Sequence, residues 1–85
     1  MYRLTFTDRA LKSLKSIPKQ DAEKIIGQLQ ELAESPQSKS NVKCLQNHPR
    51  AVFRLRVGNY RVLFNKYIEF EVIEVIDLGH RKEIY

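Results

Sequence analysis

The sequence predicts a small α+β domain of order β-α-α-β-β-β, in which an N-terminal helical hairpin packs on a small, mostly antiparallel sheet. Two observations support this class. The first half of the chain contains two stretches whose apolar residues recur at helical spacing, and the second half contains runs that alternate between apolar and polar residues. With 85 residues, of which 42% are hydrophobic, the chain has the size and composition of one folded domain, residues 1–85.

The first predicted elements are a short strand and a helix. Residues 2–6 alternate and indicate the strand. Thr7 offers a capping hydroxyl and Asp8 an acid for the first turn, so we expect a helix to begin here. Apolar residues then recur at helical spacing as far as Ile17, and Pro18 either ends this helix or opens the next.

A second helix is expected from Lys19 to Glu34, because its apolar residues fall on one face. Ser35-Pro36 marks its end. Residues 36–50 have no lasting period, and a connection of this length indicates a functional loop. Val42 and Leu45 are expected to hold the middle of the loop against the core.

The remainder of the chain predicts three strands. Residues 51–57 and 60–67 flank Gly58-Asn59, a pair typical of a hairpin turn. Residues 68–78 predict the third strand, and its nearly all-apolar VIEVI run indicates a central position in the sheet. Gly79 is expected to end it.

The hairpin register concentrates positive charge on one face of the sheet. If Gly58 and Asn59 form a two-residue loop, Arg56 lies directly opposite Arg61, and Arg54 lies on the same face. Directly opposed like charges destabilise a sheet by a few tenths of a kcal/mol or more. One explanation is that solvent screens these charges and that Glu69 or Glu71 on the next strand pairs with the arginines. The other explanation is that the face binds phosphate, for which guanidinium groups are well suited.

The C-terminal segment HRKEIY adds further candidate groups. His80 could carry a proton near neutral pH, Arg81 and Lys82 add positive charge, and Tyr85 offers a ring for base stacking and a phenolic hydroxyl. Arg50 and Lys43, in the preceding long loop, are two more basic residues.

Composition narrows the class of protein. Fifteen basic residues against ten acidic ones give a net charge of +5, which favours an anionic partner such as nucleic acid. The single cysteine, Cys44, permits no internal disulfide and fits a reducing compartment. No metal-ligand spacing and no phosphate-binding glycine loop is found, so we expect neither metal nor cofactor. No leader or membrane-spanning apolar stretch is visible, and we expect a cytoplasmic protein.

The run LRVGNYRVLF, followed about twenty residues later by IDLGHRKEIY, resembles the RelE/ParE superfamily of toxins from type II toxin–antitoxin pairs. The resemblance covers the whole chain. It implies a fold similar to that of small microbial ribonucleases. For the RelE-like branch it implies a ribosome-dependent mRNA endoribonuclease, which inhibits translation by metal-free attack of a 2′-OH on the adjacent phosphate. For the ParE-like branch it implies binding to DNA gyrase without RNA chemistry.

The resemblance also implies roles for individual residues. Arg61 matches the arginine that contacts the scissile phosphate, and Arg54 a lysine or arginine that stabilises the transition state. Arg81 matches an arginine that assists the leaving group, and Tyr85 a terminal tyrosine that stacks on or deprotonates the nucleotide. His80 stands where several relatives carry histidine or lysine.

A second group of basic residues is expected to bind RNA without taking part in the chemistry: Arg56, Lys82, Arg50 and Lys43. Val52 departs from the pattern, because the best-studied ribonuclease of the family has a lysine there. Either Tyr85 or His80 therefore remains a candidate general base. The implied partners are a RelB-like antitoxin, docking on the helices or on the sheet, and the ribosome with its A-site mRNA.

Overall fold

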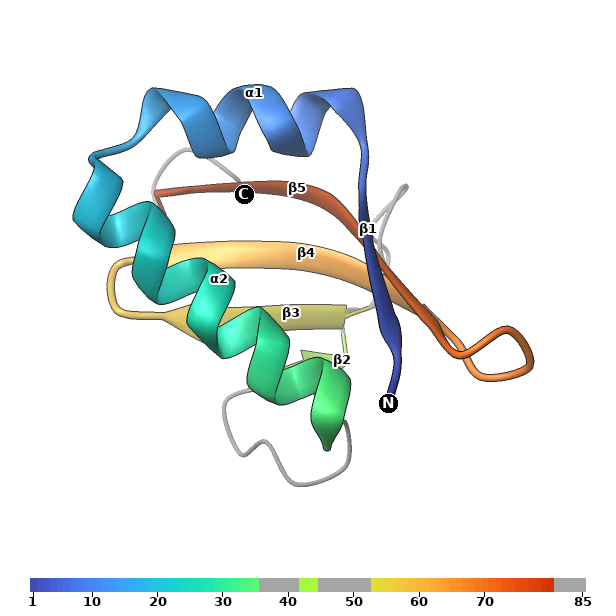
Figure 1. Ribbon diagram of the computed structural model, residues 1–85. Coiled ribbons are helices and arrows are strands. Elements are labelled where there is room, and N and C mark those ends of the chain that lie inside the picture. The colour runs from blue at the N-terminus through green and yellow to red at the C-terminus, as the bar shows by residue number, and fades with distance from the viewer. Residues whose placement is uncertain (36–41, 45–52, 81–85) are drawn as a thin grey trace.

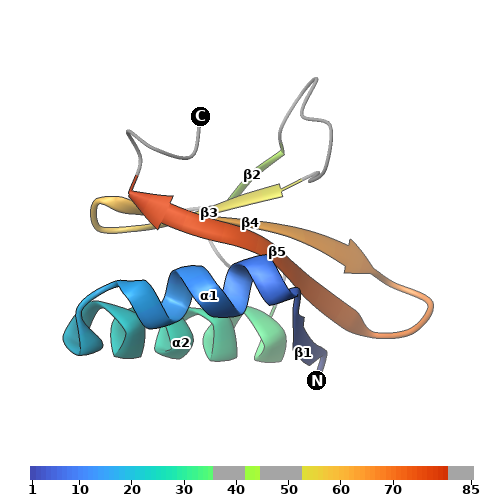
Figure 2. The ribbon, with the colours of Figure 1, turned by 90° about the horizontal axis from the view of Figure 1, so that it is seen from above.

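The computed structural model describes residues 1–35, 42–44 and 53–80, which form two helices on one side of a five-stranded sheet (Figures 1 and 2). The elements in chain order are β1 (Arg3–Phe6), α1 (Asp8–Ser16), α2 (Lys19–Glu34), β2 (Val42–Cys44), β3 (Phe53–Val57), β4 (Tyr60–Tyr67) and β5 (Val72–His80). The predicted α+β class is confirmed, with one strand more than the sequence indicated.

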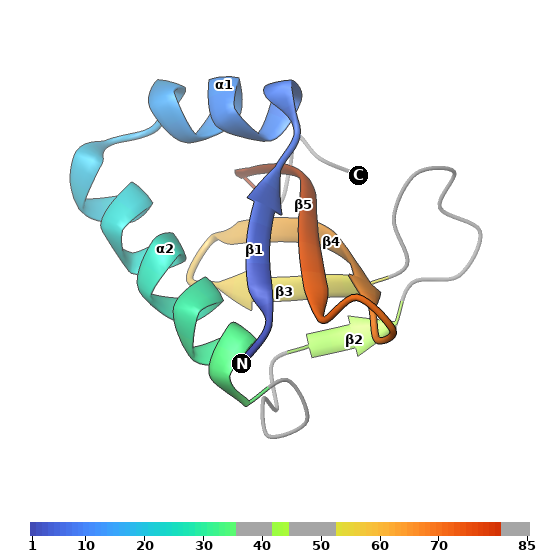
Figure 3. The same ribbon diagram turned by 45° about the vertical axis from the view of Figure 1, so that its right-hand side comes forward.

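The strands lie in the order β1-β5-β4-β3-β2. Strand β1 runs parallel to β5, whereas the other neighbours are antiparallel (Figure 3). Strand β5 therefore lies inside the sheet, as its apolar run predicted, and its Ile73 and Val75 are fully buried.

The core lies between the helices and the near face of the sheet. Helix α2 contributes Ile25, Leu29 and Leu32, and the sheet contributes residues such as Val62 and Phe64, all at most 1% exposed. Full burial of each such side chain stabilises the fold by roughly 1.5–3 kcal/mol. Val42 packs against this core as expected. Leu45 lies outside the described residues.

Helix α1 begins at the predicted cap. The hydroxyl of Thr7 accepts a hydrogen bond from the Ala10 amide at 3.1 Å and donates one to the Ile76 carbonyl at 2.6 Å. The hydroxyl of Ser13 donates to Asp77 Oδ1 at 3.0 Å. These hydrogen bonds fasten α1 to β5 at the place where the register of β5 with β4 shifts, between Val75 and Asp77.

Helix α2 spans Lys19–Glu34, as predicted. Pro18 occupies its N-cap position, so this proline opens the second helix. Between the two helices Ile17 has extended backbone angles, φ −99° and ψ 161°, which end α1.

The third strand was predicted wrongly at both ends. Residues 68–71 form the turn between β4 and β5, with Ile68 and Phe70 69% and 76% exposed. The alternation IEFE resembles a strand and contains no glycine, proline or asparagine, so the usual turn signals are missing. Glu71 instead completes the turn in the left-handed region, at φ 52°.

Strand β5 also continues through Gly79, which was expected to end it. Gly79 pairs with Arg61 and His80 pairs with Tyr60. Ladder hydrogen bonds use only backbone groups, so a glycine supported by a neighbouring strand can remain in the sheet.

Strand β2 was not predicted. It is three residues long, too short for a period of two to be recognised, and it pairs with β3 from Val42↔Leu55 to Cys44↔Phe53. The predicted start of β3, residues 51–52, lies outside the described residues.

Candidate active site on the outer face of the sheet

The β3–β4 hairpin has the predicted register. Val57 pairs with Tyr60, and Arg56 lies directly opposite Arg61. Gly58 has φ +57°, whereas Asn59 does not enter the left-handed region, which is the pattern of a type II′ rather than a type I′ turn. The predicted two-residue loop is therefore confirmed. This loop determines which face of the sheet the arginines occupy.

The register separates two faces of the hairpin. Leu55 and Val62 form a directly opposed pair that is completely buried beneath the helices. Because side chains alternate along a strand, Arg54, Arg56 and Arg61 project from the face that the helices leave uncovered (Figure 2). We call this side the outer face.

The outer face carries a fourth cation. Lys43 of β2 is paired with Arg54, next to the Arg56–Arg61 pair. Two cross-strand pairs on three adjacent strands thus bring together one lysine and three arginines. Strands β2, β3 and β4 contain no aspartate or glutamate, so the positive potential is not offset by acids on the same strands.

The four cations differ in burial. Lys43 and Arg56 are exposed, whereas Arg54 and Arg61 are half-buried and their Nε atoms are shielded from solvent. Leu63, opposite Arg54 in the register, is 1% exposed and places an apolar side chain beside that guanidinium group. A half-buried guanidinium group acts on an anion through a lower effective dielectric than an exposed one does, so of the four cations Arg54 and Arg61 would interact more strongly with a phosphate placed on this face.

Pairing with Glu69 or Glu71 does not explain the arginine face. Both acids lie in the exposed β4–β5 turn, and Arg61 is near the opposite end of β4. With the usual rise per residue of a β-strand, Arg61 lies about 20 Å from the β4–β5 turn. The explanation based on these two acids is therefore wrong.

Two residues of the outer face were missed by sequence reasoning. Gly79 pairs with Arg61 and leaves a position without a side chain beside that guanidinium group. Sequence reasoning placed Leu63 neither on the outer face nor in the core. Gly79 could not be placed before the β4–β5 register was known, because that register contains a shift between Leu63 and Phe64, whereas the hairpin register alone already pairs Leu63 with Arg54.

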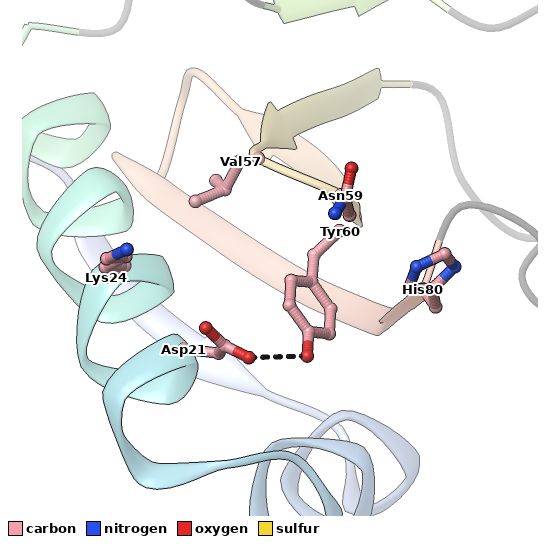
Figure 4. Close-up of a pocket in the computed structure, with 7 residues that line it drawn as sticks. Asp21, Lys24, Val57, Asn59, Tyr60 and His80 are labelled. Carbon is pink, nitrogen blue, oxygen red and sulfur yellow. Dashed lines mark hydrogen bonds between the residues drawn. The ribbon is translucent and has the colours of Figure 1, made fainter.

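His80 does not lie with the arginines. It is paired with Tyr60 and shares the helix side of the sheet with it, and the two rings meet edge to face at a centroid distance of 6.0 Å. Tyr60 donates a hydrogen bond to Asp21 Oδ2 at 2.7 Å (Figure 4). These residues line a cavity of about 250 Å³ between the start of α2, the hairpin turn and the end of β5.

The structure thus brings together Arg54, Arg56, Arg61 and Lys43, and it separates His80 from them. The other predicted site residues, Arg50, Arg81, Lys82 and Tyr85, lie outside the described residues.

The chain matches a known family over almost its entire length. The sequence model described as "ParE toxin of type II toxin-antitoxin system, parDE" matches residues 4–85. The chain therefore belongs to the RelE/ParE superfamily of type II toxins. No match was found among curated proteins.

Solved structures of RelE toxins have the same fold. The toxin–antitoxin complex RelE–RelB of Pyrococcus horikoshii superposes with a TM-score of 0.80 at 25% identity, covering 96% of this chain and 97% of that one. The intact Escherichia coli RelBE complex gives 0.76 at 28% identity, covering 94% and 96%. A doubly mutated E. coli RelE toxin in the free state gives 0.74 at 30% identity, covering 98% and 86%.

Several of the similar solved structures are complexes of a RelE toxin with a RelB antitoxin. Neither α1 nor α2, the helices of the described residues, has the length and apolar character needed to cross a membrane.

Proposed function

We propose that this toxin is a RelE-like, ribosome-dependent mRNA endoribonuclease. The observation that supports the proposal best is the outer face, where Arg54 and Arg61 are half-buried and flanked by exposed Lys43 and Arg56. Such an array suits a phosphodiester whose negative charge increases during reaction. The RelE toxins among the similar solved structures support the same branch.

The proposed reaction is an internal transfer of the phosphodiester. The 2′-oxygen of one nucleotide attacks the adjacent phosphorus and loses its proton to a general base. The bond from phosphorus to the 5′-oxygen then breaks, and that oxygen takes up a proton. The products are a 2′,3′-cyclic phosphate and a free 5′-hydroxyl. The additional negative charge on the equatorial oxygens is the charge that Arg61 and Arg54 stabilise, through N–H donors fixed before the reaction.

Two further roles in the chemistry follow from the family resemblance. Arg81 assists the leaving 5′-oxygen, and Tyr85 stacks on the nucleotide and is the proposed general base. Lys43, Arg50, Arg56 and Lys82 bind the RNA backbone on either side of the reacting phosphate. The ribosome supplies mRNA in the A site, and we propose the cytoplasm as the location of this reaction.

The family description supports a second candidate function. The matching model is that of ParE toxins, so inhibition of DNA gyrase without RNA cleavage is the alternative. The arginine face would then bind an acidic protein surface or DNA.

In vitro translation followed by toeprinting separates the two functions. We expect the purified toxin to produce new mRNA 3′ ends at the ribosomal A site, with no cleavage of the same mRNA in the absence of ribosomes. A parallel supercoiling assay with gyrase is expected to be unaffected. Intact ribosome-bound mRNA together with inhibited supercoiling would overturn the nuclease proposal in favour of the ParE-like one.

A further inference from the structure

We infer that His80 is a positioning residue that anchors the end of β5, and that it does not carry the proton of the reaction. This inference rests on the proposed function for its kinetic consequence. The anchoring of β5 through Tyr60 and Asp21 depends only on contacts between described residues.

The anchor begins on α2. Asp21, in the first turn of that helix, accepts the hydrogen bond of the Tyr60 hydroxyl at 2.7 Å. Both side chains are half-buried. A hydrogen bond from a hydroxyl to a carboxylate is short and stronger than one between neutral groups, so it fixes the orientation of the phenol ring (Figure 4).

The fixed ring then holds His80. Tyr60 and His80 are directly opposed on β4 and β5, and their ring planes are inclined at 73° in an edge-to-face contact. This is a favourable geometry for two aromatic rings. Asp21, Tyr60 and His80 thus link α2, β4 and the last residue of β5 in one chain of contacts.

The same register keeps the imidazole from the reacting phosphate. Side chains of β5 alternate, so Gly79 is level with Arg61 on the outer face while His80 lies on the helix side. The backbone of the sheet separates the imidazole from the guanidinium groups. A proton carrier must come within hydrogen-bond reach of the 2′-OH, directly or through one water, and this position does not satisfy that requirement.

The anchor has a consequence for the outer face. The last residues of a strand readily lose their backbone pairing with the adjacent strand unless side-chain contacts keep them in place. With His80 packed on Tyr60, β5 stays paired with β4 up to its final residue. That pairing flanks Arg61 with Gly79 and sets the point from which the chain continues to Arg81.

Two substitutions of one residue test the inference by cleavage kinetics. His80→Phe keeps a planar ring against Tyr60 but cannot transfer a proton, whereas His80→Ala removes the ring. We expect His80→Phe to keep kcat within about threefold of wild type with an unchanged pH–rate profile, and His80→Ala to lower kcat roughly tenfold or more. Lys24→Ala, which alters the same cavity but not the chain of contacts, is the matched control and is expected to be near normal.

A second measurement does not depend on activity. Amide hydrogen exchange of Arg61 and of residues 78–80 is expected to be about fivefold faster in His80→Ala and in Tyr60→Phe than in wild type. His80→Phe and Lys24→Ala are expected to keep the wild-type protection.

The outcomes are distinguishable. An equal decrease of kcat in His80→Phe and His80→Ala overturns the inference, especially if the pH–rate profile loses a limb near neutrality. Normal cleavage by both variants, or unchanged amide exchange in His80→Ala, overturns it as well. If the wild-type protein cleaves no RNA, the proposed function fails, and the exchange measurement alone decides whether His80 anchors β5.

Discussion

Arg54 and Arg61 differ from the other cations of the outer face in being half-buried with shielded Nε atoms. Their side chains are therefore held in place before RNA binds. Preorganised donors of this kind act most strongly in the transition state, where the charge develops. In the proposed reaction, exposed Lys43 and Arg56 attract RNA in the ground state and the transition state alike.

We predict that Arg61→Ala lowers kcat for A-site cleavage by about 10²–10³, as removal of one donor to a developing oxyanion does. Arg61→Lys keeps the charge but not the planar fork, and it is expected to recover only part of the rate. The measurement is single-turnover cleavage on programmed ribosomes. Lys12→Ala removes one exposed charge from α1 and is the control. Near-normal rates for Arg61→Ala would exclude this arginine from the site.

Arg81→Ala is predicted to lower cleavage by orders of magnitude, because a leaving 5′-oxygen without its cationic partner is a poor leaving group. Circular dichroism should show an unchanged fold. If a substrate with an activated leaving group is cleaved no better than normal RNA by this variant, the role in leaving-group departure is wrong.

At the level of elements, the start of α1 is joined to β5 by one hydroxyl. Thr7 caps the helix and also donates to the Ile76 carbonyl. We predict that Thr7→Ala lowers the free energy of unfolding by about 1–2 kcal/mol, because it removes the cap and a second hydrogen bond. Thr7→Ser keeps the hydroxyl and should be much less destabilised. Urea denaturation measures both, and equal values for the two variants would contradict the assigned role.

Two glycines have opposite predicted effects when they are replaced by alanine. An added Cβ meets no atom within 4 Å at either Gly27 or Gly58, so only the backbone conformation differs. Gly27 lies within α2, where alanine should raise the free energy of unfolding by about 1 kcal/mol. Gly58 has φ +57°, where alanine should lower it by about 1–2 kcal/mol. The same urea titration measures both, and a stabilising Gly58→Ala would contradict the type II′ turn.

For the whole molecule, the net charge of +5 and the cations gathered on the outer face predict a salt-dependent interaction with RNA. Removal of one phosphate-binding cation should reduce the slope of log K against log salt by about 0.7 for a single strand. The double variant Lys43→Ala with Arg56→Ala should therefore lower the slope by about 1.4 in a fluorescence titration with single-stranded RNA. Lys12→Ala is again the control, and an equal reduction there would mean that charge alone, without the outer face, determines binding.

The sequence predicted much of this molecule because the decisive signals are local. Thr7, Pro18 and the Gly58-Asn59 pair marked helix starts and a turn, and the two-residue loop alone determined which face the arginines share. The side of the sheet taken by His80 was not predictable. It depends on the shift in the β4–β5 register near Leu63, which no turn residue or periodicity in the sequence marks. The turn containing Glu71 was missed because a residue with no special preference for positive φ occupies it.

The parallel pairing of β1 with β5 has a consequence for how the protein is made. Arg3 pairs with Val72, and the Thr7–Ile76 hydrogen bond joins residues 69 positions apart. The first strand to leave the ribosome therefore finds its neighbour only after almost every other element has been synthesised, and contacts of such long range form slowly. Gly79 and His80 arrive later still. Gly79 flanks Arg61 and is synthesised after all four cations of the outer face, so the proposed site is complete only once β5 has paired with β4.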